Sequence, residues 1–257
     1  MKVTVCELNN DIQQFEKDWE QLVAHCQLNK SELVLLSEMP FYSWIANRPS
    51  VDDSLKIKAE RAHEEWLGRI EELGAAIVAY TKPWTKGNKF YNSAYVWTKE
   101  TGHQKVHTKH FFPEEEGFYE DTWFEREPMD FELIEVNGLK IGFLLCTEIW
   151  FTQYTRKYAL EGIDFLLCPR ATGKSSVEQW IRCGQTSSVI GGCYCLSSNR
   201  SGIGEDNFHW GGTGWICQPM DGALLGKTTQ EVPFLTLDID LNKSKLAKKE
   251  YPIYVKE

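Results

Sequence analysis

Three side chains with complementary chemistry stand at or near the ends of apolar segments. They are Glu38 in "LLSEMPF", Lys109 in "HTKHFFP" and Cys146 in "GFLLCTE". A thiol becomes strongly nucleophilic when a base removes its proton, and a carboxylate in a dry pocket can act as that base. An ammonium group can stabilise the oxyanion that forms when a carbonyl carbon is attacked. Taken together, the three residues fit nucleophilic catalysis by a cysteine that needs no histidine.

The cysteine is not distinctive on its own. The chain has 8 cysteines, scattered and without a CxxC pair, and Cys168 stands in the similar phrase "DFLLCP". In a chain of this length without a secretory signal, such a pattern is typical of reduced thiols, most of them small buried hydrophobic residues. Cys146 differs because a helix-forming stretch is predicted to follow it directly. Backbone N–H groups at the start of a helix favour the thiolate.

A metal site is the alternative for the lysine segment. His103, His107 and His110 are spaced at intervals that can hold zinc when they lie on a helix. The interleaved lysines and the nearby Pro113 disfavour a metal, and no cysteine or acid pairs obviously with the histidines. We therefore predict no metal here.

Apolar segments alternate with amphipathic ones, which indicates the elements that hold these residues. The predicted strands cover residues 2–8, 32–38, 75–80, 90–98, 139–146, 163–169 and 193–199. The predicted helices cover residues 11–29, 50–73, 152–162 and 176–190, whereas residues 99–131 look irregular. This order predicts an α/β fold with a mixed sheet or two packed sheets and helices on the outer faces. Because no linker or repeat is visible, we expect a single domain over residues 1–257.

The charge balance limits the partners. The chain of 257 residues has a formal net charge of −9, so no basic surplus exists to neutralise the phosphates of nucleic acid or an anionic membrane. The N-terminus lacks the apolar core of a signal peptide, and no uncharged apolar run is long enough to span a bilayer. We expect a cytoplasmic protein that acts on a small molecule and binds neither nucleic acid nor a membrane.

At these residues the sequence resembles the nitrilase, or carbon–nitrogen hydrolase, superfamily. The resemblance covers nearly the whole chain in six phrases that occur in the order of the family. The phrases are "LLSEMPF", "HTKHFFPEEEGFYEDTWF", "GFLLCTEIWF", "ALEGIDFLLCPRATG", "CLSSNRSG" and "GGTGWICQPMDGALL". One such phrase is weak support, but six in order are a strong signal.

The resemblance implies a four-layer α-β-β-α sandwich with two packed mixed β-sheets and helices on the outer faces. It also implies an amide or nitrile hydrolase without a cofactor. By position Glu38 would be the general base and Lys109 the cation near the oxyanion. Cys146 would form the acyl-enzyme, and the N–H of Thr147 would also face the oxyanion. The family often has a second glutamate in the lysine segment.

That second glutamate is Glu120 by its spacing, with Glu116 as the alternative. Arg170 stands where the family usually has small residues, and we weigh two roles for it: binding an anionic substrate, or forming an ion pair at the surface or an interface. Aromatic residues near these phrases are candidates for the pocket wall, namely Phe41, Phe118 and Trp150. The glycine-rich residues 202–214 are expected to form a loop beside the active site.

The substrate is left open by the sequence. Relatives that hydrolyse nitriles tend to be longer at the C-terminus, so we expect an amide, with nitriles and N-carbamoyl compounds as alternatives. Transfer of the acyl group to an amine and a catalytically inactive binding module are further possibilities on the same fold. Many members of the family associate through the helix after the nucleophile strand, so a homodimer or higher homo-oligomer is expected.

Overall fold

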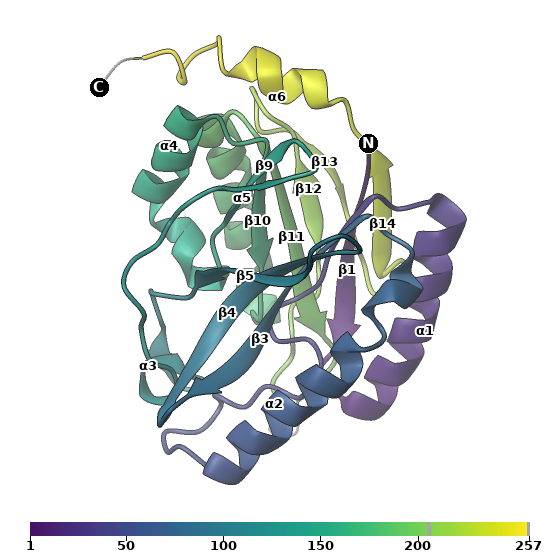
Figure 1. Cartoon of the computed structure of the whole chain (residues 1–257), viewed down its shortest axis with the longest axis vertical. Helices are drawn as coiled ribbons and strands as arrows, with labels where there is room; N and C mark the ends of the chain where they lie inside the picture. Colours follow the sequence, from purple (N-terminus) through teal and green to yellow (C-terminus); the bar gives the residue numbers. More distant parts are fainter. Residues whose placement is uncertain (205–206, 256–257) are drawn as a thin grey trace.

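Two β-sheets packed face to face form the centre of the protein, with helices on both outer sides (Figure 1). The structure is a computed structural model that describes residues 1–204 and 207–255. Glu205 and Asp206, which belong to the expected glycine-rich loop, lie outside the described residues. The expected four-layer α-β-β-α arrangement is confirmed.

Each sheet is mixed. The first contains, in spatial order, β5 (Gly102–Thr108), β4 (Lys89–Thr98), β3 (Ile77–Lys86), β2 (Leu33–Leu35) and β1 (Lys2–Asn9), with β14 (Phe234–Asp238) also paired to β1. The second contains β8 (Ile134–Val136), β9 (Leu139–Phe143), β10 (Phe165–Pro169), β11 (Tyr194–Ser201), β12 (Trp215–Cys217) and β13 (Leu224–Lys227). The sheets join where the last residues of β1 run parallel to the end of β11.

The core between the sheets follows from the alternation of side chains along each strand. Val3 and Val5 of β1 point to the same face as Leu33 and Leu35 of β2. The second sheet contributes residues such as Phe143 to the same buried cluster. Intervening positions point outward and pack against the helices, so the strands are apolar on both faces.

The helices cover these outward faces. On the first sheet lie α1 (Ile12–Asn29) and α2 (Asp53–Leu67), and on the second lie α4 (Thr152–Glu161) and α5 (Val177–Gly191) (Figure 1). Asp11 and Asp52 cap the first two helices through side-chain oxygens that accept backbone N–H groups. The remaining elements are short: β6 (Glu114–Glu115), β7 (Phe118–Tyr119), α3 (Glu120–Trp123), α6 (Leu241–Ala247), and the 3₁₀ helices η1 (Ile70–Leu73), η2 (Cys146–Trp150) and η3 (Lys174–Ser176).

Two predicted elements need correction. Residues 99–131 are not irregular throughout, because β5 occupies Gly102–Thr108 at the edge of the first sheet. This strand is largely polar and exposed, so the apolar alternation typical of a strand is missing. The helix predicted over residues 50–73 ends at Leu67, and a separate 3₁₀ helix follows it.

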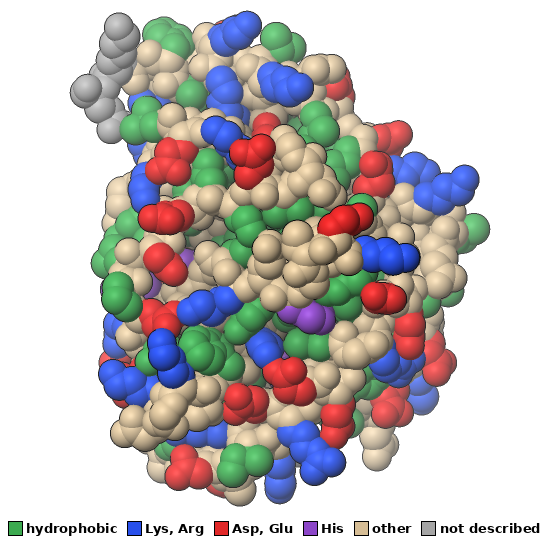
Figure 2. All heavy atoms as spheres, in the orientation of Figure 1, with side chains coloured by type: hydrophobic (Ala, Val, Ile, Leu, Met, Phe, Trp, Pro, Cys, Tyr) green, Lys and Arg blue, Asp and Glu red, His purple; other side chains and the backbone are tan. Residues whose placement is uncertain are grey.

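The surface is mixed in charge. On the face shown in Figure 2, acidic and basic side chains of the described residues are interspersed rather than segregated. Within residues 1–204 and 207–255, no helix combines the length and the apolar character needed to cross a membrane.

The sheet topology also explains where the chemistry is located. Strands β1, β2 and β3 are parallel to one another, and so are β9, β10 and β11. Glu38 follows β2 and Cys146 follows β9. Lys109 follows β5, which runs in the same direction as β3 because both are antiparallel to β4. All three residues therefore leave their strands at the carboxyl ends, the edge at which α/β folds place their sites.

Candidate active site

Sharp turns carry the base and the nucleophile out of the sheets. Cys146 has a φ of 49° and begins the 3₁₀ helix η2, and Met39, directly after Glu38, has a φ of 43°. Left-handed backbone is uncommon outside glycine and is found preferentially at functional sites. These turns direct the side chains of Glu38 and Cys146 into the space between the strand ends rather than along the sheet.

Lys109 is the centre of the charged cluster. Its Nζ donates to Glu120 Oε2 at 2.7 Å, to Glu120 Oε1 at 2.9 Å and to Glu38 Oε1 at 2.9 Å. All three side chains are buried. Glu116, the alternative second glutamate, is exposed and is not part of this cluster. The structure thus brings Glu38, Lys109 and Glu120 together in one buried cluster.

The two carboxylate oxygens of Glu38 have different surroundings. Oε1 accepts from Lys109 and from Asn92 Nδ2, the latter at 2.8 Å. Oε2 is buried and has no hydrogen-bond partner among the described residues. An unpaired buried carboxylate oxygen is costly unless it exchanges a proton or binds a ligand. It is the oxygen available to a thiol or a substrate.

Electrostatics keep Cys146 protonated at rest. Burial and the nearby Glu38 raise the pKa of its thiol well above the usual value, while Lys109 and the backbone N–H of Ala171 act in the opposite direction. Burial alone would lower the pKa of Lys109, but Glu120 and Glu38 outweigh it and raise that pKa. Burial raises the pKa of Glu120 to about 8. A thiol in this environment reacts only if a base takes its proton during the attack.

Glu148 supports the turn behind the nucleophile. Its Oε2 accepts from the N–H of Leu145 at 2.8 Å and from Nε2 of His107 at 2.7 Å, and its Oε1 accepts from the N–H of His110 at 2.6 Å. These contacts connect the turn at Cys146 to the end of β5 and to the segment that follows it. His107 contacts this carboxylate through its ring and His110 only through its backbone N–H, whereas the ring of His103 binds the Tyr80 hydroxyl, so the three rings have different surroundings.

Arg170 does not lie at the surface, which was one of the two roles weighed from the sequence. Its side chain is fully buried, and its three nitrogens donate to Ser197 Oγ at 2.6 Å, Thr172 Oγ1 at 2.9 Å and the carbonyl oxygen of Thr213 at 2.7 Å. Three of its five N–H groups therefore have protein partners, and the guanidinium lies inside the protein rather than at the surface. Its backbone carbonyl accepts from the N–H of Glu38 at 3.1 Å.

Two residues beside the base received no role in the sequence analysis. Asn92 holds Glu38 Oε1, and Arg200 donates through Nε to the carbonyl oxygen of Glu38 at 3.0 Å. A signal existed for both, since Asn92 interrupts the apolar strand "FYNSAYVW" and Arg200 lies in the family-like phrase "CLSSNRSG". Their partners are distant in the sequence, so only the fold reveals the contacts.

Phe41 does not line the active site, although the sequence analysis expected it in the pocket wall. It is fully buried between the first sheet and its helices, stacked on Trp66 with ring centroids 6.2 Å apart. The turn at Met39 sends this side chain to the outer face of the sheet rather than to the strand end. The pocket-wall role for Phe41 is therefore corrected to a role in helix packing.

The other predicted pocket residues lie at the catalytic end. Phe118 packs against Trp44 and Trp210, at centroid distances of 6.0 and 5.9 Å. Trp150 is 47% exposed and lines, together with Thr147, an open groove of about 500 Å³. The Thr147 hydroxyl donates to the carbonyl oxygen of Phe111 at 2.6 Å. This hydrogen bond connects Thr147 to the segment that contains Lys109.

Comparison with known proteins identifies the family of the chain. A family model described as carbon-nitrogen hydrolase matches residues 2–249. A 2-oxoglutaramate amidase of Bacillus subtilis (strain 168) is 25% identical over 210 residues, which cover 79% of this chain and 76% of the relative.

Solved structures share the fold. A carbon-nitrogen hydrolase from Helicobacter pylori G27 superposes with a TM-score of 0.86 at 20% identity, covering 98% of this chain and 94% of the other. A glutamate-to-glutamine mutant of the amidase from Nesterenkonia sp. AN1 superposes with a TM-score of 0.79 at 15% identity, again over 98% and 94%. That mutant carries the acetamide moiety of fluoroacetamide covalently added at its active-site cysteine.

Proposed function

This chain belongs to the carbon-nitrogen hydrolase family, and from that premise we propose that it hydrolyses a small amide through an acyl-enzyme on Cys146. The products are a carboxylic acid and ammonia or an amine. The relative named as an amidase and the covalent cysteine adduct of the Nesterenkonia amidase support this reaction class. The catalytic residues of the proposal are Glu38, Lys109, Cys146 and Glu120.

In the first half-reaction Glu38 Oε2 takes the thiol proton while Cys146 Sγ bonds to the carbonyl carbon of the amide. The carbonyl oxygen becomes an oxyanion that Lys109 and the N–H of Thr147 stabilise. Glu38 then gives the proton to the amide nitrogen, the C–N bond breaks, and ammonia or an amine leaves. The acyl group remains on sulfur as a thioester.

In the second half-reaction Glu38 takes a proton from water, whose oxygen attacks the thioester carbonyl. The C–S bond breaks, the carboxylic acid leaves, and the proton returns to the sulfur. Glu120 contributes by holding the Lys109 ammonium through both of its oxygens. No cofactor takes part in this proposal.

One observation carries the proposal: the unequal oxygens of Glu38. Oε1 is held by Lys109 and Asn92, so the carboxylate is fixed in orientation and its charge is partly balanced. Oε2 is buried and unpaired among the described residues, so its lone pairs are available for proton transfer. A purely structural ion pair leaves no reason for a buried oxygen without a partner.

The test is ammonia release across short-chain amides, ω-amides and N-carbamoyl compounds. We expect activity that stoichiometric alkylation of Cys146 abolishes and that Cys146→Ala lacks. Glu38→Gln is expected to keep an alkylatable thiol but to stall turnover. Full activity in Cys146→Ala would refute the proposal. Formation of an acylated amine instead of the free carboxylic acid would show that the enzyme is an acyl transferase rather than a hydrolase.

Further properties extend the proposal. We expect a single domain and a cytoplasmic location, in line with 8 cysteines that are all free in the structure. A homodimer or higher homo-oligomer is also proposed. Exposed apolar residues near α4, among them Leu160 and Tyr251, support association on this side of the molecule. Light scattering at micromolar concentration tests the oligomeric state.

A further inference from the structure

The segment after β10, residues 170–172, lies between the base and the nucleophile and has no role in the mechanism above. The carbonyl oxygen of Arg170 accepts from the N–H of Glu38 at 3.1 Å. The next residue, Ala171, directs its N–H toward the sulfur of Cys146. The single peptide unit that joins Arg170 to Ala171 therefore contacts the backbone of the base through its oxygen and the nucleophile through its nitrogen.

The neighbouring N–H groups of this segment have oxygen partners. The N–H of Arg170 donates to the carbonyl oxygen of Ser198 at 2.9 Å, and the N–H of Thr172 donates to Asn199 Oδ1 at 3.0 Å. Ala171 is only 1% exposed, and no oxygen of the described residues accepts from its N–H. Because buried backbone N–H groups are almost always paired, the sulfur is the partner of this donor.

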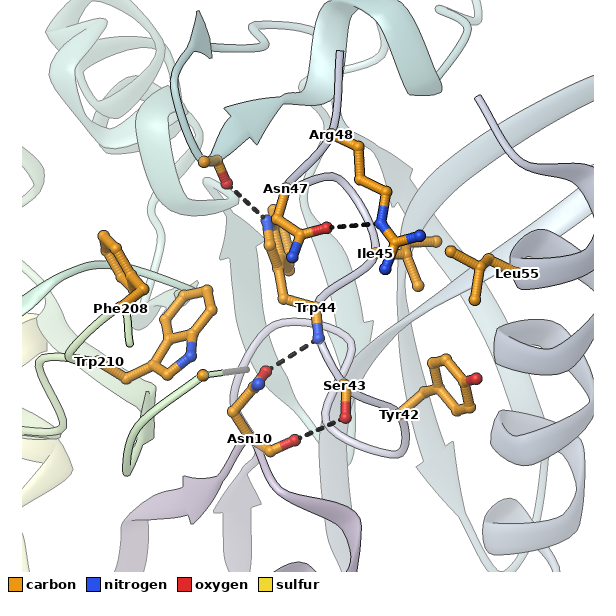
Figure 3. Close-up of a pocket in the computed structure, with 12 residues that line it drawn as sticks. Asn10, Tyr42, Ser43, Trp44, Ile45, Asn47, Arg48, Leu55, Phe208 and Trp210 are labelled. Carbon is orange, nitrogen blue, oxygen red and sulfur yellow. Dashed lines mark hydrogen bonds between the residues drawn. The ribbon is translucent and has the colours of Figure 1, made fainter. Parts of the chain in front are cut away.

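A ligand in the neighbouring cavity is not an alternative partner. This cavity of about 90 Å³ has Trp44 and Trp210 in its wall (Figure 3). The N–H of Gly211, next to Trp210, donates to the carbonyl oxygen of Thr172 at 2.8 Å and so connects the wall to the segment. Ala171 is not among the residues that line the cavity. An occupant of the cavity is therefore not a partner of the Ala171 N–H.

A donor at the sulfur matters most when the sulfur carries charge. Hydrogen bonds to an ionised acceptor are about twice as strong as neutral ones, and they favour the ionised form. In the proposed reaction the sulfur of Cys146 gains negative charge twice, when Glu38 takes its proton and when the C–S bond of the thioester breaks. The N–H of Ala171 serves the sulfur at both steps, whereas Lys109 and the N–H of Thr147 serve the carbonyl oxygen.

The buried side chain of Arg170 holds the segment in place. Its guanidinium donates to Ser197 Oγ on β11 at 2.6 Å, to Thr172 Oγ1 within the segment at 2.9 Å and to the carbonyl oxygen of Thr213 at 2.7 Å. An arginine presents its donors in a planar fork, so three acceptors fix its orientation. The segment is thereby connected to β11 and to the loop before β12.

The loop partner of this arginine has an unusual backbone conformation. Thr213 has a φ of 61°, which is a genuine outlier for a β-branched residue. Its N–H donates to Oε1 of the buried Glu7 at 2.7 Å. A buried carboxylate and a buried guanidinium therefore contact this residue from its two peptide bonds. Such a conformation persists only where the surroundings hold it, and it is found preferentially at functional sites.

We propose that the Ala171 N–H is a further catalytic group, a donor that stabilises the Cys146 thiolate, and that Arg170 is the residue that positions it. One peptide unit then keeps the nucleophile and the backbone of Glu38 at a fixed separation. Arg170 acts on the reaction without touching the substrate. The inference rests on the amidase function proposed above and adds a group to its site.

The first test removes the N–H alone. Replacing Ala171 by lactic acid turns the peptide bond into an ester and keeps the methyl side chain. We expect the pH profile for alkylation of Cys146 by iodoacetamide to shift to higher pH, so that the rate constant at neutral pH falls about tenfold. For a hydrolysed amide, kcat should also fall about tenfold while KM stays close to that of the wild type.

Alkylation is the deciding readout, because the ester also weakens the Arg170 carbonyl oxygen as an acceptor for Glu38. Mass analysis of the peptide that contains Cys146 measures it without any amide substrate. The matched control replaces Ala223 by lactic acid, which removes an N–H that donates to Asp221 Oδ1 in a turn. This control should keep the alkylation profile and the kcat of the wild type.

The second test concerns the positioning residue. Arg170→Lys keeps the charge but loses the fork, so the N–H of Ala171 is no longer held at the sulfur. We expect slower alkylation of Cys146 at neutral pH and a kcat lower by about tenfold or more, with KM close to that of the wild type. The matched control Arg61→Lys, on the exposed face of α2, should keep both rates. If Arg170→Lys does not fold, the ester at residue 171 decides.

The outcomes separate this inference from the proposed function. A folded ester variant with the wild-type alkylation profile would overturn the thiolate donor, whatever its kcat, and leave the amidase function intact. A folded Arg170→Lys enzyme with wild-type alkylation and kcat would overturn the positioning role. A shifted alkylation profile in an enzyme that hydrolyses no amide of the ammonia-release screen would support the donor and overturn the proposed function.

Discussion

Glu120 shows how a single side chain prepares the site without reacting itself. It binds the Lys109 ammonium through both oxygens and leaves that cation the Glu38 carboxylate as its third partner. An ammonium group has three N–H donors, so the cluster in its resting state is fully satisfied at the lysine. When an oxyanion forms, Lys109 can approach it while Glu120 continues to hold the lysine in position.

The first prediction concerns this residue. Glu120→Gln replaces one of the two oxygens that accept from Lys109 with an amide NH₂ group, so the lysine loses its position and we expect kcat to fall by about 10²-fold or more because oxyanion stabilisation is lost. Alkylation of Cys146 should still reach one equivalent, since the thiol is intact. The matched control is Glu116→Gln, at an exposed position of the same segment, which should retain full activity. Loss of activity in the control and not in Glu120→Gln would reverse the assignment.

Some residue assignments were accessible from the sequence and others were not. Glu38, Lys109, Cys146 and Glu120 stand in phrases that resemble the family, and the structure places them at one edge of the sandwich. The location of Phe41 was not accessible, because it depends on the turn conformation beside it. Pairing between distant strands is equally invisible, so the contact of Asn92 with the base emerges only from the fold.

At the scale of elements, the site depends on hydrogen bonds between the loops that follow the strands. Glu148, in the turn after β9, accepts hydrogen bonds from the loop after β5. Glu148 and His107 are both buried. Removing one partner of a buried pair of carboxylate and protonated imidazole strongly destabilises the folded protein, because the other partner is left without a counter-charge. Glu148 stands two residues after Cys146 in the sequence, but its partner His107 lies on β5, which was not predicted as a strand.

The second prediction is a pH-dependent stability at this pair. Burial lowers the pKa of His107, but Glu148 and Asp130 outweigh it and raise the pKa to about 9, from an unfolded value of 6.5. Stability from the charged pair is therefore complete below about pH 6.5 and is lost as the pH rises through about 9. His107→Gln should lower the free energy of unfolding by about 3–5 kcal/mol at pH 6 and by clearly less at pH 10.

Urea unfolding at both pH values measures this difference. The control is His103→Gln, because burial lowers the pKa of His103 and its contribution therefore changes with pH in the opposite sense. A destabilisation by His107→Gln that is equal at pH 6 and pH 10 would contradict a charged His107–Glu148 pair.

The third prediction addresses Arg170, which connects the end of β10 to β11 and to the loop containing Thr213. Arg170→Lys keeps the charge but loses the planar fork, so we expect a loss of about 3 kcal/mol in the free energy of unfolding as buried acceptors lose their donors. The KM for a hydrolysed amide should stay close to that of the wild type. A stable variant whose KM rises for amides that carry a carboxylate, and not for neutral amides, would assign Arg170 to the substrate instead.

At the scale of the whole molecule, the active site is shared between the two sheets. Glu38 and Lys109 follow strands of the first sheet, whereas Cys146 and Ala171 follow strands of the second. The sheets are held together by the buried cluster between them and by the short parallel pairing of β1 with β11. Alignment of base and nucleophile therefore depends on the core, at a distance from the chemistry.

The fourth prediction tests this dependence. Leu167→Ala removes a fully buried side chain from the core between the sheets, and we expect a loss of about 2–5 kcal/mol in the free energy of unfolding. Activity and tryptophan fluorescence should be lost over the same range of urea concentration. The control Leu28→Ala, at an exposed position of α1, should change stability by about 0.5 kcal/mol or less. Separate transitions for activity and fluorescence would show that the site opens independently of the core.

The central claim is that Cys146 carries the acyl group during amide hydrolysis. The most direct measurement is acid quenching of the wild-type enzyme during turnover of a hydrolysed amide, followed by mass analysis of its peptides. We predict the acyl mass on the peptide containing Cys146, at no more than one group per chain, and its absence in Cys146→Ala, which should also be inactive. Hydrolysis by Cys146→Ala at the wild-type rate, or an acyl group on another residue during turnover, would contradict the account.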